Sequence, residues 1–378
     1  MHLEENKPLA PFTTFGIGGR ARWFAQAATE DEIVEATAWA RERGLRLFVL
    51  GGGSNLLVAD AGFDGLVLKV GLRGIAVAPD EGQDYRSSRI PEVHPSGAKA
   101  PINSGGMDVR AEALTYQAAA GEDWDGFVER VVNDNCAGVE CLAGIPGTVG
   151  GTPVQNVGAY GQEVASVIQR VRAFDLRQRA FVELSAAECG FSYRRSRFNS
   201  VDRGRYIVTR VDYCLTEGGA PTLGYPELRR AVQESQPQGR EANLAEVAAV
   251  VRSVRQSKGM LLVEGDPDCR SAGSFFKNPV VAEADLRRIA ERREKEPPSF
   301  PAGPGMVKVP AAWLIEQAGF GKGYTLGRAA VSSRHTLALV NFGGATAVEI
   351  LALADQIAAG VEARFGVSLE MEPVMVGF

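Results

Sequence analysis

Two glycine-rich segments, far apart in the chain, constrain its fold more than any other feature. The first, Gly51–Asn55, lies between two apolar runs, and the second, Gly144–Gly161, combines glycines, a proline and side-chain amides between apolar flanks. Neighbouring glycines allow successive backbone N–H groups to point into one concavity, which suits a phosphate. A single loop of this kind is more often only a tight turn. Two of them, at the ends of strand or helix units, fit a ligand with two phosphates, such as the dinucleotide FAD.

The surroundings of Gly51–Asn55 argue against an ordinary Rossmann site. A capping box formed by Thr29 and Glu32 begins a helix that Gly44 ends, and the β-rich run 45–50 follows. After the glycines we expect further strand at 56–58 and 65–70 rather than a helix. The spacing also departs from G-x-G-x-x-G, so the dinucleotide would be held in another way.

The length of 378 residues predicts two to three domains of mixed α+β structure. Residues 80–106 are polar and rich in Pro, Gly and Ser, which favours an exposed insertion. We expect a helix from about 122 to 138 with an apolar stripe, alternating strands over 169–215, and a short connection at 221–238. The remaining expected elements are helices at 243–257, from about 283, between Pro310 and Gly319 and at 345–364, and a strand at 367–372.

Composition excludes several classes of protein. Lys and Arg number 41 against 46 Asp and Glu, a net charge of -5, so a nucleic-acid partner is not expected. Three histidines and five scattered cysteines without a Cys-x-x-Cys pair argue against a metal site or a disulfide framework. We see no signal segment and no apolar run long enough for a bilayer. The expectation is a monomer in the cytoplasm, without a membrane partner.

Three further motifs combine groups that catalysis uses. Tyr193–Phe198 contains an arginine cluster, which is either a solvated basic hairpin or a clamp for a carboxylate or phosphate. Ala272–Pro279 places a serine beside two aromatics, a lysine and an amide; no Gly-x-Ser-x-Gly pattern is present, so the serine fits a proton donor better than a hydrolase nucleophile. In the expected last strand, period two puts Glu370 and Glu372 on one side.

These motifs, in this order, resemble the UDP-N-acetylenolpyruvoylglucosamine reductase (MurB) family, in the longer class with a substrate-covering tyrosine. The resemblance covers nearly the whole chain apart from the insertion. The matching stretches are 6–19, 51–55, 144–161, 193–198, 273–279, 308–319 and 369–377.

The resemblance implies a vanillyl-alcohol-oxidase (PCMH) type FAD-binding part in two lobes, residues 1–70 and 71–215, and a C-terminal α+β substrate-binding part, residues 216–378. It implies FAD and NADPH as cofactors. The residues that would bind FAD are Gly51, Gly52, Gly53, Ser54, Asn55, Ile145, Pro146, Gly147, Thr148, Gly150, Asn156 and Val157.

The resemblance also assigns the catalytic groups. Arg194 would stabilise charge on the substrate, Ser274 would donate a proton, and Glu372 would assist in a protonated state, since a bare carboxylate would repel the developing charge. Lys277 is the expected cation beside Ser274. The residues that would line the substrate pocket are Tyr160, Tyr225, Lys258, Lys277, Asn278 and His335.

The implied reaction is the NADPH-dependent reduction of UDP-N-acetylglucosamine enolpyruvate to UDP-N-acetylmuramate, with hydride from flavin N5 and protonation by Ser274. It belongs to peptidoglycan precursor synthesis, and so to cell-wall biogenesis, cell shape and cell division. Two alternatives stay open: an FAD-dependent sugar or alcohol oxidase of the same fold, and a non-catalytic nucleotide-sugar sensor. Few histidines disfavour a tethered flavin, and a sensor needs no proton donor.

Overall fold

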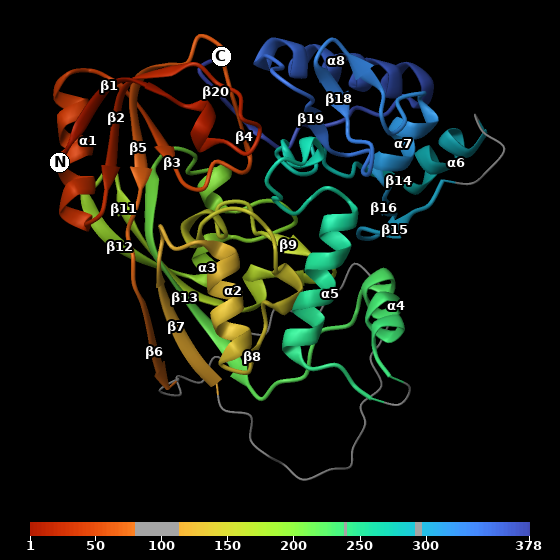
Figure 1. Cartoon of the computed structure of the whole chain (residues 1–378), viewed down its shortest axis with the longest axis horizontal. Coiled ribbons are helices and arrows are strands. Elements are labelled where there is room, and N and C mark those ends of the chain that lie inside the picture. The colour runs from red at the N-terminus through yellow and green to blue at the C-terminus, as the bar shows by residue number, and fades with distance from the viewer. Residues whose placement is uncertain (80–112, 238–239, 292–296) are drawn as a thin grey trace.

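The structure is a computed structural model that describes residues 1–79, 113–237, 240–291 and 297–378. The insertion expected at 80–106 lies outside these ranges. Within them, no helix combines the length and apolar character that crossing a bilayer requires. Three regions are visible in Figure 1: an N-terminal sheet with one helix, a second sheet below it, and a C-terminal region of helices and small sheets beside both.

The first sheet has the strand order β1-β2-β5-β3. Helix α1 connects β2 to β3 and begins at the predicted Thr29–Glu32 capping box. β2, β3 and β5 are mutually parallel, so the turns after β3 and β5 lie at one edge of the sheet. These elements are β1 (Leu3–Pro8), β2 (Arg20–Ala27), α1 (Glu30–Glu42), β3 (Arg46–Leu50) and β5 (Phe63–Val70). As predicted, Gly51–Asn55 is a turn between strands, followed by β4 (Leu56–Val58).

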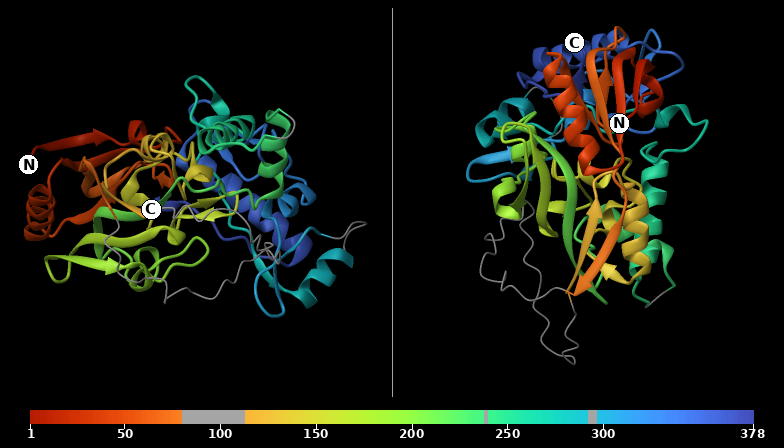
Figure 2. Two further views of the ribbon diagram at one scale, coloured as in Figure 1. Left: turned by 90° about the horizontal axis from the view of Figure 1, so that it is seen from below. Right: turned by 90° about the vertical axis from the view of Figure 1, so that its left-hand side faces the viewer.

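The second sheet is antiparallel, in the order β12-β11-β13-β7-β6, with β8 also paired to β13. The predicted apolar stripe of α2 is buried, and α2 and α5 lie side by side over this sheet (Figure 1). The elements are β6 (Ile75–Pro79), β7 (Ala113–Ala119), α2 (Trp124–Asn133), β8 (Cys136–Ala137), β11 (Ile168–Asp175), β12 (Ala180–Ser185), α3 (Ala186–Cys189), β13 (Tyr206–Glu217) and α5 (Leu244–Ser257). The right-hand view of Figure 2 shows the first sheet above the second.

The connection predicted at 221–238 is wrong in part, because it contains the helix α4 (Pro226–Ser235). The signals for it are present: Pro226 presets the backbone of the first turn, and Leu228 and Val232, four residues apart, form its buried face. Both leucine and valine pack, with α5, in the hydrophobic core of the second sheet.

The C-terminal region packs around the long helix α8, which begins at a Thr346–Glu349 capping box and ends at Gly366 in the left-handed conformation. Its core also takes in Phe15, Ile17 and Leu57 from the amino-terminal part of the chain. The elements are β14 (Val280–Ala282), α6 (Glu283–Glu291), β15 (Phe300–Pro301), β16 (Met306–Lys308), α7 (Ala311–Gln317), β17 (Thr325–Leu326), β18 (Ala329–Val331), β19 (Leu339–Asn341) and α8 (Ala347–Phe365).

The strand predicted at 367–372 is wrong in position. The last strand is β20 (Val374–Val376), which pairs in parallel with β4 of the amino-terminal region. Residues 367–372 make a single bridge, between Met371 and Phe276. The chain changes partners at Pro373, whose ring nitrogen carries no hydrogen: Glu372 N–H donates to Phe275, and Val374 N–H donates to Asn55.

The remaining short elements lie in loops, several of which contribute to the candidate active site described below. They are β9 (Gly158–Ala159), β10 (Gln162–Glu163) and 3-10 turns at Ala10–Phe12, Glu140–Leu142, Val149–Gly151, Val164–Ser166, Arg197–Asn199 and Pro267–Cys269.

Candidate active site

The two glycine-rich loops lie in direct contact. A Cβ atom added to Gly52 would lie 2.5 Å from the Cα of Gly147, so only two backbones without side chains can approach in this way. At Gly51 an added Cβ would meet the Thr148 hydroxyl at 3.0 Å. Thus segments nearly a hundred positions apart in the chain form one continuous wall of backbone.

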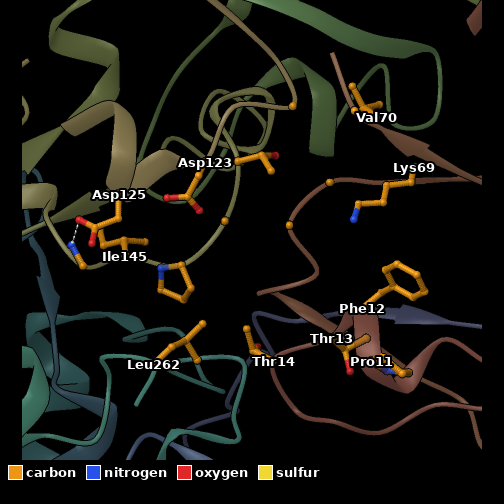
Figure 3. Close-up of a pocket in the computed structure, with 18 of the residues that line it drawn as sticks. Pro11, Phe12, Thr13, Thr14, Lys69, Val70, Asp123, Asp125, Ile145 and Leu262 are labelled. Carbon is orange, nitrogen blue, oxygen red and sulfur yellow. Dashed lines mark hydrogen bonds between the residues drawn. The ribbon is translucent and has the colours of Figure 1, made fainter. Parts of the chain in front are cut away.

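This wall borders a cavity of about 930 Å³ between the first sheet and the second (Figure 3). The opposite sides come from the 3-10 turn at Ala10–Phe12, the end of β5, the start of α2 and Leu261 and Leu262. Of the predicted cofactor residues, the lining contains Gly51, Gly52, Ile145, Pro146, Gly147 and Thr148. The others lie outside this lining: Gly53, Ser54, Asn55, Gly150, Asn156 and Val157.

A polar atom in the wall lacks a partner. The Thr148 hydroxyl oxygen is fully covered and makes no hydrogen bond to any residue that the structure describes. Leaving a buried hydroxyl unpaired costs roughly 1–3 kcal/mol. A hydrogen-bonding ligand in the cavity would remove that cost.

Three predicted site residues adopt a backbone conformation that side chains disfavour. Asn156, Tyr160 and Arg194 have positive φ angles of 45°, 51° and 54°. The Asn156 amide donates to Glu163 and to the Ser192 carbonyl, and Arg194 donates to the Gly158 carbonyl. These bonds tie the end of the second glycine-rich loop to the arginine cluster. Strained backbone of this kind concentrates at functional sites.

Arg194 and Glu372 form a close pair although 178 positions separate them. The Arg194 Nε lies 3.1 Å from Glu372 Oε1, but its N–H makes no aligned hydrogen bond to a described residue. Only 12% of the Glu372 side chain is exposed. This burial raises the pKa of Glu372 above its ordinary value, although Arg194 and Lys277 act in the opposite direction. The carboxyl is therefore favoured in its neutral, proton-bearing form relative to an exposed glutamate.

Backbone pairing brings Ser274 beside this pair. Its neighbour Phe275 accepts a hydrogen bond of 2.8 Å from the backbone N–H of Glu372, and Ser274 itself bridges to Ala338. Lys277 is 2.5 Å from Glu370, which is 72% exposed. Both glutamates thus lie near Lys277, but Glu370 is exposed whereas Glu372 is largely covered.

Four of the predicted substrate residues, Tyr160, Tyr225, Lys258 and His335, lie near one another. The rings of Tyr160 and Tyr225 meet edge to face at 5.7 Å, and the Lys258 ammonium lies 5.9 Å from the centre of the Tyr160 ring while pairing with Glu227 at 2.7 Å. Burial and the nearby cations Lys258 and Lys322 lower the pKa of His335 to about 4, so this imidazole is neutral near pH 7. Asn278 has a structural partner as well: its side-chain oxygen accepts the N–H of Ala311 at the start of α7.

Comparisons with known proteins agree over the length of the chain. Residues 21–83 and 103–178 match the FAD binding domain family, and residues 266–376 match the UDP-N-acetylenolpyruvoylglucosamine reductase, C-terminal domain family. The UDP-N-acetylenolpyruvoylglucosamine reductases of Thermobifida fusca and Streptomyces coelicolor are each 43% identical over 98% of this chain and over 97% and 89% of their own lengths. The chain belongs to the UDP-N-acetylenolpyruvoylglucosamine reductase family.

A solved member of this reductase family supports the same fold. The crystal structure of the enzyme (MurB) from Thermus caldophilus covers 100% of this chain and 99% of its own, at 25% identity and a TM-score of 0.62. The predicted fold class, an FAD-binding part followed by an α+β C-terminal part, is confirmed, and FAD and NADPH are the cofactors of the family. The residues of this chain fit FAD: two bare backbones meet at Gly52 and Gly147, and the unpaired Thr148 hydroxyl lies beside a large cavity.

Two basic residues, Arg255 and Lys308, lie near Arg194 and escaped the sequence prediction. Arg255 is buried, donates to the Gly144 and Met260 carbonyls, and has its pKa lowered by burial. A sequence signal existed, because Arg255 continues the buried stripe of α5 in which the other positions are apolar. Lys308 lies 4.7 Å from the centre of the Tyr193 ring, and burial lowers the pKa of Lys308; an isolated lysine in the sequence carries no comparable signal.

Proposed function

We propose that this chain catalyses the NADPH-dependent reduction of UDP-N-acetylglucosamine enolpyruvate to UDP-N-acetylmuramate, the reaction of its family. The observation that carries the proposal is the convergence of Arg194, Glu372 and the Ser274 segment beside two abutting glycine-rich loops. Each group comes from a different part of the chain. A pocket that only bound a nucleotide sugar would need no proton donor beside a buried acid.

FAD would supply the hydride for the reduction. We assign its diphosphate to the loops at Gly51–Asn55 and Ile145–Gly150, which supply backbone to the cavity lining, and place Asn156 and Val157 nearer the flavin. The two lobes 1–70 and 71–215 would then share the cofactor, and 216–378 would hold the substrate.

The chain's own groups would manage charge and protons on the substrate. Arg194, held in a strained conformation, would stabilise negative charge next to the substrate carboxylate, and removing such a donor typically costs about a hundredfold or more in rate. Glu372 would act in its neutral form, which its raised pKa favours. Ser274 would donate the proton to the substrate carbon. Because Lys277 is paired with the exposed Glu370, only part of its positive charge would act on Ser274.

We assign the substrate's diphosphate and sugar to the side that carries Tyr160, Tyr225, Lys258, Lys277, Asn278 and His335. Two cations and a neutral imidazole fit an anionic, hydroxyl-rich ligand. The protein would work as a monomer in the cytoplasm, in the synthesis of peptidoglycan precursors, and so serve cell-wall formation and cell division.

The decisive experiment follows the absorbance of the purified protein without oxygen. NADPH should bleach a yellow preparation, and UDP-N-acetylglucosamine enolpyruvate should then restore the colour with formation of UDP-N-acetylmuramate. Oxygen uptake driven by a sugar or alcohol, without a response to the enolpyruvyl substrate, would instead support the oxidase alternative. A colourless protein that does not take up added FAD would contradict both.

A further inference from the structure

Lys69 occupies a position in the cofactor cavity to which no role has been assigned. It is the penultimate residue of β5 and pairs in register with Leu50, the last residue of β3, directly before the Gly51 turn. Its side chain lines the cavity and in Figure 3 reaches from the strand into the open space. The ammonium lies 4.9 Å from the centre of the Phe12 ring. Lys69 therefore projects beside the first glycine-rich loop.

Lys69 differs from the other charged residues that line the cavity. The charged lining residues are Lys69, Arg73, Asp123, Asp125 and Glu264. Arg73 pairs with Glu122 at 3.1 Å, whereas no ion pair of Lys69 occurs in the part of the chain that the structure describes. The backbone N–H groups of the loops offer dipoles but no full charge. Asp125 is paired as well, with Arg252 at 2.8 Å. A ligand with two phosphates would therefore meet the carboxylates of Asp123 and Glu264, and Lys69 is the cation among the described lining residues that no carboxylate already neutralises.

We propose that Lys69 is the counter-charge for the diphosphate of FAD, and that its position over Phe12 holds the ammonium toward the first glycine-rich loop. A cation on an aromatic face keeps its donors free for an anion. The inference rests on the placement of FAD proposed above. It concerns affinity for the cofactor and not the reduction of the substrate.

The test measures binding to the deflavinated protein by fluorescence, with FAD and with riboflavin, which lacks the phosphates. Lys69→Met should weaken FAD binding about tenfold, the typical value of one charge-assisted contact, and should reduce the dependence of FAD binding on salt. Riboflavin binding should not change. Lys69→Arg, which keeps the charge, should restore most of the affinity.

Lys7 provides a matched control. Its ammonium lies 5.9 Å from the centre of the same Phe12 ring, but it pairs with Glu4 and is outside the cavity lining. Lys7→Met should leave FAD binding unchanged. Equal weakening of FAD and riboflavin by Lys69→Met, or equal effects of the two Met variants, would overturn the proposal, because packing around Phe12 would then explain the result.

A second measurement applies if removing FAD unfolds the protein. The fraction of FAD that the purified holoenzyme retains during dialysis at low salt should be smaller for Lys69→Met than for wild type, and the difference should narrow as the salt concentration rises. Identical retention at low salt would overturn the proposal. Gly52→Ala distinguishes the placement of FAD from the role of Lys69. If it abolishes FAD binding while Lys69→Met has no effect, the placement of the cofactor stands and the role of Lys69 falls. If neither variant alters FAD binding, the placement itself is wrong.

Discussion

Gly52→Ala should separate the two glycine-rich loops and weaken FAD binding. The new Cβ would lie 2.5 Å from the Cα and 2.7 Å from the carbonyl carbon of Gly147, whereas carbon atoms in contact stand about 3.5–4.0 Å apart. Both neighbours are backbone atoms, so no side chain can rotate away, and one loop must move by about 1 Å. Overpacking of this kind costs about 1–3 kcal/mol.

The consequence depends on how the strain is relieved. If the loops part, the backbone N–H groups no longer converge, and a loss of about 1–3 kcal/mol corresponds to about a fivefold to hundredfold weaker affinity for FAD. Gly151→Ala is the matched control in the second loop, because the nearest atom to its new Cβ is the Thr148 hydroxyl at 3.9 Å, an ordinary contact. It should bind FAD as the wild type does.

Titration of the deflavinated proteins with FAD, together with thermal unfolding, distinguishes the outcomes. The reasoning fails if Gly52→Ala binds FAD with wild-type affinity, or if Gly151→Ala is impaired to the same degree. A lower melting temperature with unchanged affinity would show that the strain is absorbed elsewhere, which would also refute the assignment of the loops to the cofactor.

Three further predictions address other parts of the molecule. Ser274→Ala should leave the bleaching of the flavin by NADPH intact while product formation falls about a hundredfold or more; normal turnover would remove Ser274 from its role. The pKa of His335 is about 4 in the folded protein, against an ordinary value of 6.5, so the unfolded chain binds more protons below pH 6.5, and stability should fall as the pH decreases through that range. From about pH 7.5 to about pH 5 this contribution amounts to about 2 kcal/mol, and urea unfolding of His335→Gln should lack it. Glu140 is fully buried and accepts hydrogen bonds from Gly138, Gln162 and Thr222. Glu140→Ala should therefore lower the unfolding free energy by about 3 kcal/mol or more, and denaturation no easier than that of wild type would contradict this.

Local features of the sequence determined the local structure. The capping box at Thr29 acts through bonds within a few residues, so α1 begins where the sequence predicts it. α8 (Ala347–Phe365) lies within two residues of the helix expected at 345–364. The prediction of a strand at 367–372 was wrong because the position of a strand depends on its hydrogen-bonding partners elsewhere in the chain. Before Pro373 the chain end bonds to residues 275–277, and after Pro373 it pairs with β4.

The sequence also predicted part of the candidate site, because some of its features are local. Glycines, a serine beside aromatics and an arginine cluster identify groups suited to the chemistry, and their order identifies a family. Which of these groups touch is decided by packing: the contact of Gly52 with Gly147, and of Arg194 with Glu372, joins segments that share no local signal.

Burial, and with it reactivity, belongs to the tertiary structure alone. Glu370 and Glu372 are the same residue type two positions apart, yet one is 72% and the other 12% exposed, and the pKa of Glu372 is raised because folding removes water from it. The sequence by itself determined the chemical groups and the elements that carry them. The packing of distant segments decided which groups meet, because desolvation and contact depend on neighbours that only the folded chain supplies.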